Sequence, residues 1–309
     1  MKFDFDGILN SQRLAITRAL SFVENADNLD ISLTDALFKY LGRAYRIGVT
    51  GPPGAGKSSL VDKIIDYWRG QDKRVAVISV DPTSPFTGGA ILGDRVRMGR
   101  HYADKGVFIR SMATRGNHGG LAIRAQDFAD IFDAAGYDII IYETVGVGQV
   151  ELDVAKAADT TIVVLVPESG DDIQAMKAGL MEIANLFVIN KADRQGANQA
   201  FAQLLSMLEM RQPVEGIWRP QVIKTSAIKG EGITDLTSAI HEHQTFLETR
   251  GIIRQNFRDR VSAKILTHIG EQLSSRFWTV AKRDLLTKAL AIENIQDLVP
   301  GKVVQALLK

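Results

Sequence analysis

The stretch YRIGVTGPPGAGKSSLVDKIIDYW, residues 45–68, decides the fold of this chain. It begins with an apolar, β-branched run, passes through a glycine-rich turn and ends in a segment whose apolar residues have helical spacing. Within it, residues 51–58 read GPPGAGKS and satisfy the pattern G-x-x-x-x-G-K-[ST]. A glycine-rich turn without function is the alternative, but a strand before the pattern and a helix after it are the context that a phosphate-binding loop requires.

The residue types of this loop suit a bound phosphate group. Glycines let backbone N–H groups wrap around the phosphate, and the amino terminus of the following helix adds a positive dipole. Lys57 is expected to reach the terminal phosphates, and Ser58 to hold a magnesium ion. The nucleotide-binding residues predicted here are Gly51, Pro52, Pro53, Gly54, Ala55, Gly56, Lys57, Ser58 and Ser59.

Outward from the loop, short β-branched runs alternate with polar turns and helical stretches. The runs are YRIGVT, VAVISV, VFIRSM, DIIIYE, TIVVLV, LFVIN and VIKTS. Several are apolar at nearly every position, which is typical of parallel strands covered on both faces. We therefore predict an α/β fold with a doubly wound, mostly parallel sheet, whose ligand binds at the carboxyl ends of the strands.

Helical patterns flank this central part. Residues 12–41 have apolar residues three and four apart, and after about residue 250 the strand patterns stop. We predict a helical extension over 1–43, a nucleotide-binding domain over 44–249 and a helical segment over 250–309. An apolar stripe in the last segment runs through Phe257, Val261, Ile265, Ile269, Leu273 and Phe277. Because a strict step of four drifts around a helix, the stripe winds, and it could pack on its own domain or on a second subunit.

The composition excludes several classes of protein. The chain has 309 residues, with 37 basic and 36 acidic residues and a net charge of +1, so it has no global field for nucleic acid or an anionic membrane. It has no cysteine, which excludes disulfides, thiolate metal sites and thiol nucleophiles. The first residues resemble neither a signal peptide nor a transit peptide, and no run of eighteen apolar residues occurs. We expect a cytoplasmic protein without a nucleic-acid or membrane partner.

Three carboxylates stand where a magnesium–nucleotide site needs them. Asp81 ends the run VAVISV, Asp94 lies in the glycine-rich stretch that follows, and Glu143 ends DIIIYE. One carboxylate at a strand end is often only solvated, but three at matching places indicate a site. We predict Lys57, Asp81, Asp94 and Glu143 as catalytic residues. The predicted ligands of Mg²⁺ are Ser58, Asp81, Asp94 and Glu143.

The sequence NKAD, residues 190–193, indicates the base of the nucleotide because it directly follows the apolar run LFVI. Asp193 can accept two hydrogen bonds from guanine, a pattern that adenine cannot supply. Asn190 and Lys191 are expected to brace the loop and cover the base. The sequence TSA, from Thr225 through Ser226 to Ala227, ends another run and can offer a backbone N–H to the guanine oxygen. GTP is therefore the predicted substrate and GDP the product.

Five segments together resemble one family over essentially the whole chain. They are GVTGPPGAGKSSL, VDPTSPFTGGAILGDRVRM, YETVGVGQVE, SGDDIQAMKAGLMEIA and NKAD. They are similar to those of the GTPase chaperones of methylmalonyl-CoA mutase, the MeaB/ArgK-like group of SIMIBI-class P-loop GTPases. The resemblance implies that Ser58, Asp81, Asp94 and Glu143 surround magnesium and the terminal phosphate, with Asp81 and Asp94 in switch segments.

The resemblance also implies a partner and an assembly. It implies a third switch near Glu168 to Lys177 that touches the partner, and carboxyl-terminal helices that form a dimerisation arm in a homodimer. GTP hydrolysis would gate delivery of adenosylcobalamin to an acyl-CoA mutase, or removal of damaged cofactor from it. Glu168-Ser169 and Asn117-His118 depart from the family pattern, which bears on the identity of the mutase.

Several alternatives stay open. His118 is either a switch residue or a solvated loop histidine. His241 and His243 lie two apart on a presumed helix, so they face different directions and predict no metal site. Three functions are compatible with the sequence. Besides a mutase chaperone, the chain could be a metal-insertion or transport-associated nucleotide-binding module, or a protein that holds GTP without turnover. For hydrolysis we expect in-line attack of water oriented by Asp81, slow without a partner.

Overall fold

The chain forms two compact units. The computed structural model describes residues 3–25, 31–81, 98–113, 120–144, 150–169, 178–210, 212, 214–291 and 298–309. The described residues up to Arg260 belong to the first unit, and those from Val261 to Lys309 belong to the second.

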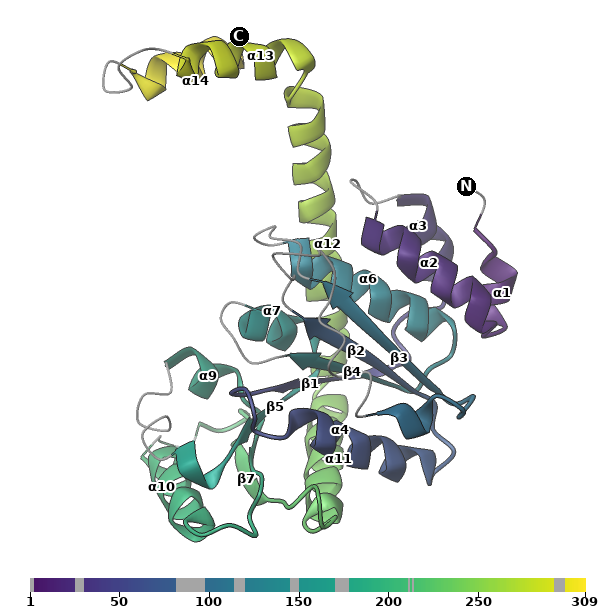
Figure 1. Ribbon diagram of the computed structural model, residues 1–309, viewed down its shortest axis with the longest axis vertical. Helices are drawn as coiled ribbons and strands as arrows, with labels where there is room; N and C mark the ends of the chain where they lie inside the picture. The colour runs from purple at the N-terminus through teal and green to yellow at the C-terminus, as the bar shows by residue number, and fades with distance from the viewer. Residues whose placement is uncertain are drawn as a thin grey trace. The chain divides into compact units, whose positions relative to one another are not determined.

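A parallel β-sheet organises the first unit (Figure 1). Its strands are β1 (Tyr45–Thr50), β2 (Val75–Asp81), β3 (Val107–Ala113), β4 (Ile139–Thr144), β5 (Thr160–Leu165), β6 (Leu186–Ile189) and β7 (Gln221–Lys224). In the part of the chain that the structure describes, the seven strands have the order β3-β2-β4-β1-β5-β6-β7, and every neighbouring pair is parallel. The predicted doubly wound α/β fold is confirmed. Strand β1 is the central strand of the sheet. The turn that follows it lies at the carboxyl edge of the sheet, where ligands of such folds bind.

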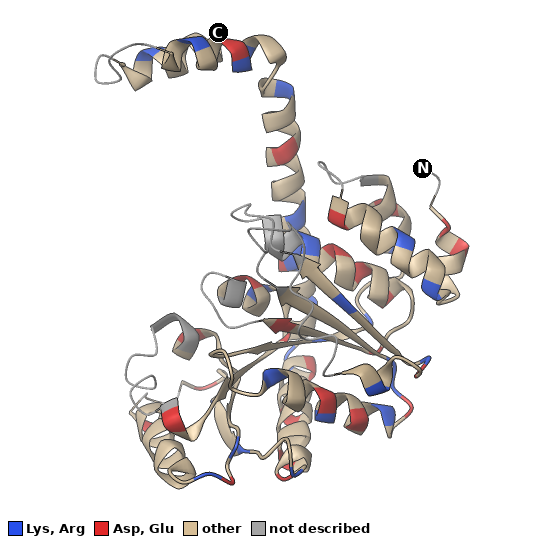
Figure 2. Ribbon diagram, in the orientation of Figure 1, with Lys and Arg blue, Asp and Glu red and all other residues tan. Residues whose placement is uncertain are grey.

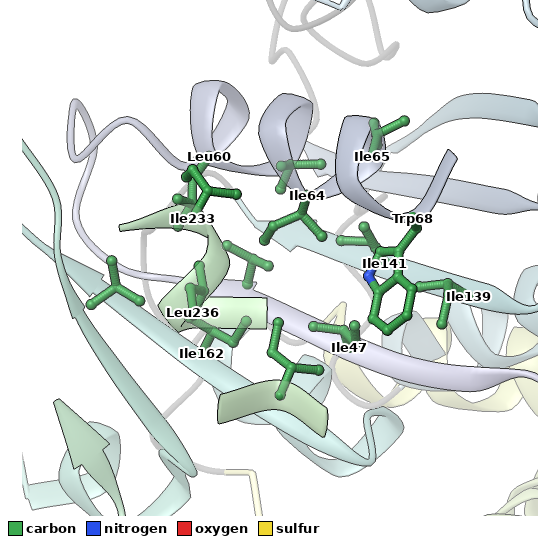
Figure 3. Close-up of a cluster of buried hydrophobic side chains, with 14 of the residues drawn as sticks. Ile47, Leu60, Ile64, Ile65, Trp68, Ile139, Ile141, Ile162, Ile233 and Leu236 are labelled. Carbon is green, nitrogen blue, oxygen red and sulfur yellow. The ribbon is translucent and has the colours of Figure 1, made fainter. Parts of the chain in front are cut away.

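Helices cover both faces of the sheet. Helices α4 (Lys57–Arg69) and α11 (Ile233–Thr249) pack on one face. Figure 3 shows this core, in which Ile64 and Trp68 of α4 and Leu236 of α11 meet the strand residues Ile141 and Ile162. Because each fully buried side chain of this size stabilises the fold by about 1.5–3 kcal/mol, this layer holds α4 firmly beneath the loop that precedes it.

The opposite face carries a second set of helices. They are α6 (Gly120–Ala134), α7 (Val150–Ala157), α9 (Ala178–Ile183) and α10 (Ala197–Glu209). Strand residues such as Val163 and Phe187 alternate with those of the first face and pack with Leu204 of α10. This alternation explains why the strands are apolar at nearly every position.

Three amino-terminal helices join the first unit through α6. They are α1 (Phe5–Leu9), α2 (Arg13–Asn25) and α3 (Ile31–Phe38), and each contacts α6. The segment between α3 and β1 is held by the carboxylate of Asp133, which accepts hydrogen bonds from the backbone N–H groups of Gly42 (2.7 Å), Arg43 (3.1 Å) and Ala44 (3.0 Å). A buried carboxylate with three backbone donors fixes the direction in which the chain enters β1.

The carboxyl-terminal helices are α12 (Ile252–Phe277), α13 (Val280–Leu290) and α14 (Pro300–Leu308). Helix α12 begins in the first unit and ends in the second. Within the second unit its side chains Ile265, Leu266, Ile269 and Leu273 are 50–67% exposed. Of these four, Ile265, Ile269 and Leu273 belong to the predicted apolar stripe, and the described residues leave them exposed.

The charged side chains are mixed over the described residues. Figure 2 shows Lys and Arg interspersed with Asp and Glu along the helices, as the net charge of +1 leads one to expect. Among the described helices, none has the length and apolar character needed to span a membrane.

Candidate functional site

The phosphate-binding loop, residues 51–56, connects β1 to α4 and depends on its glycines. Gly51, Gly54 and Gly56 have φ of +136°, +76° and +86°, values that favour glycine. A Cβ on Gly51 would lie 2.0 Å from the carbonyl oxygen of Val164, and one on Gly56 would lie 2.4 Å from Nδ2 of Asn190. The loop is therefore packed against β5 and against the NKAD segment, and its backbone conformation is fixed by these contacts.

Lys57 and its neighbours open helix α4. Its ammonium group donates hydrogen bonds to the carbonyl oxygens of Gly51 (2.7 Å) and Pro52 (3.0 Å). The side chain is buried, and these two hydrogen bonds provide the partners that a buried lysine needs. Lys57 is also the first residue of α4, and the backbone N–H groups at a helix amino terminus can bind an anion.

The predicted metal-binding residues Ser58 and Glu143 meet. The hydroxyl group of Ser58 donates a hydrogen bond of 2.5 Å to Oε1 of Glu143, across 85 residues of sequence. Both side chains are buried, at 5% and 2% exposed. A hydroxyl and a carboxylate at the carboxyl edge of the sheet are the oxygen ligands that Mg²⁺ prefers.

The other two predicted acids are only partly placed. Asp81 is the last residue of β2, in register with Ala113 of β3, and its side chain is not among those described. Asp94 lies outside the described residues. Among the side chains that the structure describes, no group of three or more His, Cys, Asp or Glu could hold a metal ion.

Asn190 links the NKAD segment to two other loops. Its Nδ2 donates to the carbonyl oxygen of Ala55 at 2.8 Å. Its Oδ1 accepts from Oγ1 of Thr225 at 3.1 Å and from the backbone N–H of Ala227 at 3.2 Å. The side chain is 2% exposed. One buried amide therefore holds together the phosphate loop, the end of β6 and the segment after β7.

Asp193 is held in an exposed position by Ser226. The hydroxyl group of Ser226 donates a hydrogen bond of 2.6 Å to Oδ1 of Asp193. This hydrogen bond is the main cause that lowers the pKa of the Asp193 carboxyl, so the group is an anionic acceptor at neutral pH. Ser226 is in turn fixed by an antiparallel bridge to Glu231. Lys191, two residues before Asp193, has a left-handed φ of +56°.

Sequence reasoning missed two features here. The segment 225–227 is predicted to offer a backbone N–H to the guanine oxygen, but the N–H of Ala227 already donates to Oδ1 of Asn190, so a ligand would have to share it. Arg194 donates a hydrogen bond of 2.6 Å to Glu168, in the 3-10 helix η2 (Pro167–Ser169), and lowers the pKa of that carboxyl. No pattern signals this pair, because a basic residue in an exposed turn is common. The pair is exposed, so its contribution to stability is at most about 1 kcal/mol.

The predicted histidines lie in separate surroundings. The ring of His241 packs edge-on against Trp68, with centroids 4.7 Å apart. His243 is buried, and its Nδ1 is 2.6 Å from Oγ1 of Thr160. The two therefore have different neighbours. His118 lies outside the described residues, and so does the third-switch stretch from Gly170 to Lys177.

The parallel sheet, the glycine loop against β5 and the buried serine–carboxylate pair define a P-loop nucleotide-binding protein. The chain belongs to the family described as methylmalonyl Co-A mutase-associated GTPase MeaB, whose family model matches residues 16–282. The resemblance stated from the sequence segments is thereby confirmed. Because proteins of this family are GTPases, the chain binds and hydrolyses GTP.

Individual relatives agree with this assignment. A protein of Pyrococcus abyssi is 45% identical over 299 residues, which cover 96% of this chain and 92% of the relative. The GTPase ArgK of Escherichia coli is 39% identical over 251 residues, covering 79% of this chain and 76% of ArgK. A Caenorhabditis elegans protein named methylmalonic aciduria type A homolog, mitochondrial, is 30% identical over 324 residues, covering 99% of this chain and 81% of that protein.

Solved structures give the same fold. The crystal structure of a protein named LAO/AO transport system kinase matches with a TM-score of 0.73 and 28% identity, covering 98% of this chain and 95% of that one. HypB from Helicobacter pylori, solved in complex with nickel, matches with a TM-score of 0.50 and 20% identity over 69% of this chain and 93% of HypB. At this identity HypB is similar in fold alone.

Proposed function

We propose that the chain is a GTPase chaperone of an adenosylcobalamin-dependent acyl-CoA mutase. GTP hydrolysis would gate cofactor loading and protect or reactivate the mutase. The observation that carries this proposal is the match of residues 16–282 to a family described as methylmalonyl Co-A mutase-associated. The name of the C. elegans relative, methylmalonic aciduria type A homolog, is in keeping with it.

Guanine recognition is assigned to the segment around Asp193. Its exposed carboxylate accepts hydrogen bonds, and guanine offers two donors, N1–H and the amine, side by side. Ser226 holds this carboxylate through its hydrogen bond of 2.6 Å to Asp193. Asn190 holds the phosphate loop through its hydrogen bond of 2.8 Å to Ala55. Lys191 and Ala227 complete the proposed base site.

Phosphate and metal binding are assigned to the opening of α4. The loop 51–59 would cradle the phosphates, with Lys57 as their charge partner. Ser58 and Glu143, already joined by a hydrogen bond, fit Mg²⁺ by the chemistry of their oxygens, and Asp81 and Asp94 are proposed to join them. The bound ion would offset negative charge on the phosphates.

Hydrolysis is proposed to use in-line attack of water on the terminal phosphate. Asp81, at the end of β2, orients the water, and Lys57 stabilises charge that develops on the phosphate oxygens. No glutamine or arginine stands at a signature position for this chemistry, so turnover by the free protein is slow. The mutase accelerates it by completing the site or by ordering the switch segments.

A homodimer is part of the proposal. In the second unit, α12 exposes Ile265, Ile269 and Leu273, which lie four apart along the helix, by 50% or more. Exposed apolar side chains in a row mark protein interaction sites, and a second copy of the same helix would cover them.

The test compares nucleotides and partners. Purified protein is incubated with GTP or ATP, with and without an adenosylcobalamin-dependent acyl-CoA mutase, and phosphate release is measured. We expect GTP to be hydrolysed, ATP not, and the mutase to raise the rate. Lys57→Ala should abolish hydrolysis. Equal use of ATP would contradict the base assignment, and a mutase that neither binds nor changes the rate would contradict the chaperone role.

A transport-associated or metal-insertion role is the second candidate, favoured by the similarity to the structure of a protein named LAO/AO transport system kinase. A transport role differs from the mutase-chaperone role in the nucleotide used, and a metal-insertion role differs from it in the cargo. A transport ATPase should bind ATP at least as well as GTP, and a metal chaperone should bind a transition metal in a nucleotide-dependent way. Competition of ATP with bound GDP, and nickel binding with and without GTP, therefore separate these roles from mutase assistance.

A further inference from the structure

Ser79 lies in a row of side chains that includes the proposed metal ligand Glu143. It is in register with Glu143 of β4 on one side and with Ser111 of β3 on the other. Side chains in register on parallel neighbours share a face of the sheet. This is the face that α4 covers, because Glu143 is bonded to Ser58 of α4 and Val77 of β2 packs in the same core as that helix.

The hydroxyl group of Ser79 lacks a partner where an apolar side chain would serve the fold better. Ser79 is 1% exposed, and none of the described residues makes a hydrogen bond with its Oγ. The preceding residues of β2 on this face, Val75 and Val77, are both apolar. A buried hydroxyl without a partner is unfavourable, so we expect the Ser79 hydroxyl to gain a hydrogen-bond partner when a ligand binds.

Distance and position favour Glu143 as the group on which Ser79 acts. Neighbouring strands lie about 4.8 Å apart, so a rotation of the side chains or one bridging water can join the Ser79 hydroxyl to the Glu143 carboxylate. Ser111 is one strand further away, at about twice that spacing. Of the two buried serines in the row, only Ser79 is therefore placed to influence Glu143.

We propose that Ser79 is a positioning residue for magnesium binding. In the magnesium–nucleotide complex its hydroxyl group donates a hydrogen bond to the Glu143 carboxylate, directly or through one water molecule, and fixes the orientation of that carboxylate. This role rests on the proposed magnesium site. It differs from a structural role because it acts only when the metal is bound.

The test measures magnesium affinity apart from turnover. Binding of a fluorescent GDP analogue to the full-length chain is titrated with Mg²⁺, and repeated in EDTA. Ser79→Ala should raise the Mg²⁺ concentration for half-maximal effect about tenfold, as loss of a group behind a metal ligand does. Affinity in EDTA should be unchanged, and the melting temperature should be equal or higher, since an unpartnered hydroxyl is removed. Ser79→Cys, which keeps the volume with a weak donor, should shift the magnesium titration in the same direction.

Ser111→Ala is the matched control, and its titration should coincide with that of the wild type. If Ser79→Ala has the magnesium dependence of the wild type, or if Ser111→Ala is shifted as much, the role of Ser79 is wrong while the metal site stands. Equal loss of affinity with and without Mg²⁺ would show a packing role and overturn the inference. If GDP binding to the wild type does not respond to Mg²⁺, the proposed metal site itself fails, and this role with it.

Discussion

Nδ2 of Asn190 donates a hydrogen bond of 2.8 Å to the carbonyl oxygen of Ala55, and this bond joins two loops 135 residues apart in sequence. The same side chain accepts hydrogen bonds from Thr225 and Ala227. The NKAD segment and the phosphate loop therefore have one fixed spacing, which would preorganise the proposed site for one whole nucleotide.

Asn190→Ala should lower GDP affinity by about two orders of magnitude, because it leaves buried donors and an acceptor in three loops without partners. Titration with a fluorescent GDP analogue measures the effect. Asn198→Ala is the control: Asn198 is exposed on α10 and accepts only a surface hydrogen bond from Lys224. Equal affinity of the two variants would show that Asn190 does not hold the site together.

Asp193→Asn should change the preferred base from guanine to xanthine. In the proposed complex the carboxylate accepts from N1–H and the amine of guanine, whereas an amide can donate to the carbonyl oxygen that xanthine has in place of the amine. Affinities for GDP and xanthosine diphosphate, measured by competition, should cross over. Asp235→Asn, an exposed acid in the first turn of α11, serves as the control. A variant that keeps its preference for GDP would place the base elsewhere.

The sheet could be predicted because its strands are buried on both faces. Runs such as VAVISV and TIVVLV are apolar at nearly every position, and each coincides with a strand to within one or two residues at either end. The order of the strands could not be read from the runs. It depends on pairings between distant segments, such as β1 with β4 and β5, and no local pattern records them.

The site was predictable where a motif has a fixed structural context. Ser58 and Glu143, both predicted as metal ligands, do meet. The internal partner of the Ala227 N–H was not predictable, since it depends on which way the Asn190 amide turns. Neither was the bond between Asp159 and Arg260, because one acid among 36 carries no signal for a partner 101 residues away.

Loss of stability in acid is expected from His243. Its Nδ1 contacts Thr160, whose Oγ1 also contacts the hydroxyl group of Tyr45. When His243 is neutral, each of these two hydrogen bonds has one donor and one acceptor: the Tyr45 hydroxyl donates to Thr160, and the Thr160 hydroxyl donates to Nδ1. Burial lowers the pKa of His243 from 6.5 to about 4. The unfolded chain therefore takes up the proton first as the pH falls.

The resulting contribution is fully present above pH 6.5 and is lost as the pH falls toward 4, by about 3 kcal/mol in total. His243→Asn keeps an acceptor near the position of Nδ1 but does not titrate, so it should flatten the pH dependence of urea unfolding between pH 7.5 and 5. His241→Asn, two residues away, is the control. If His243→Asn and the wild type lose stability in parallel, another group titrates in this range.

Self-association should depend on the exposed side chains of α12. Ile269→Asp places a charge in the row formed with Ile265 and Leu273, which a second copy is proposed to cover. Burying that charge without a partner is costly, so the variant should be a monomer in analytical ultracentrifugation at concentrations where the wild type is a dimer. Ile228→Asp, in an exposed turn of the first unit, should leave the mass unchanged. A dimeric Ile269→Asp would place the interface on another surface.

Arg260 should be essential to the stability of the first unit. Its Nη1 donates a hydrogen bond of 2.7 Å to Oδ1 of Asp159, and both side chains are buried. The other oxygen of Asp159 accepts from the backbone N–H of Arg46, at the start of β1. Removing Arg260 leaves a carboxylate in the interior without its cation, so Arg260→Ala should lower the free energy of unfolding by about 3–5 kcal/mol. Arg258→Ala, exposed on the same helix, should change it by less than about 0.5 kcal/mol in urea unfolding.

In the pair Arg260→Ala with Asp159→Asn, the double variant should be less destabilised than the sum of the single variants, because the second change removes the unpaired charge. Additive effects would show that the two groups do not stabilise each other.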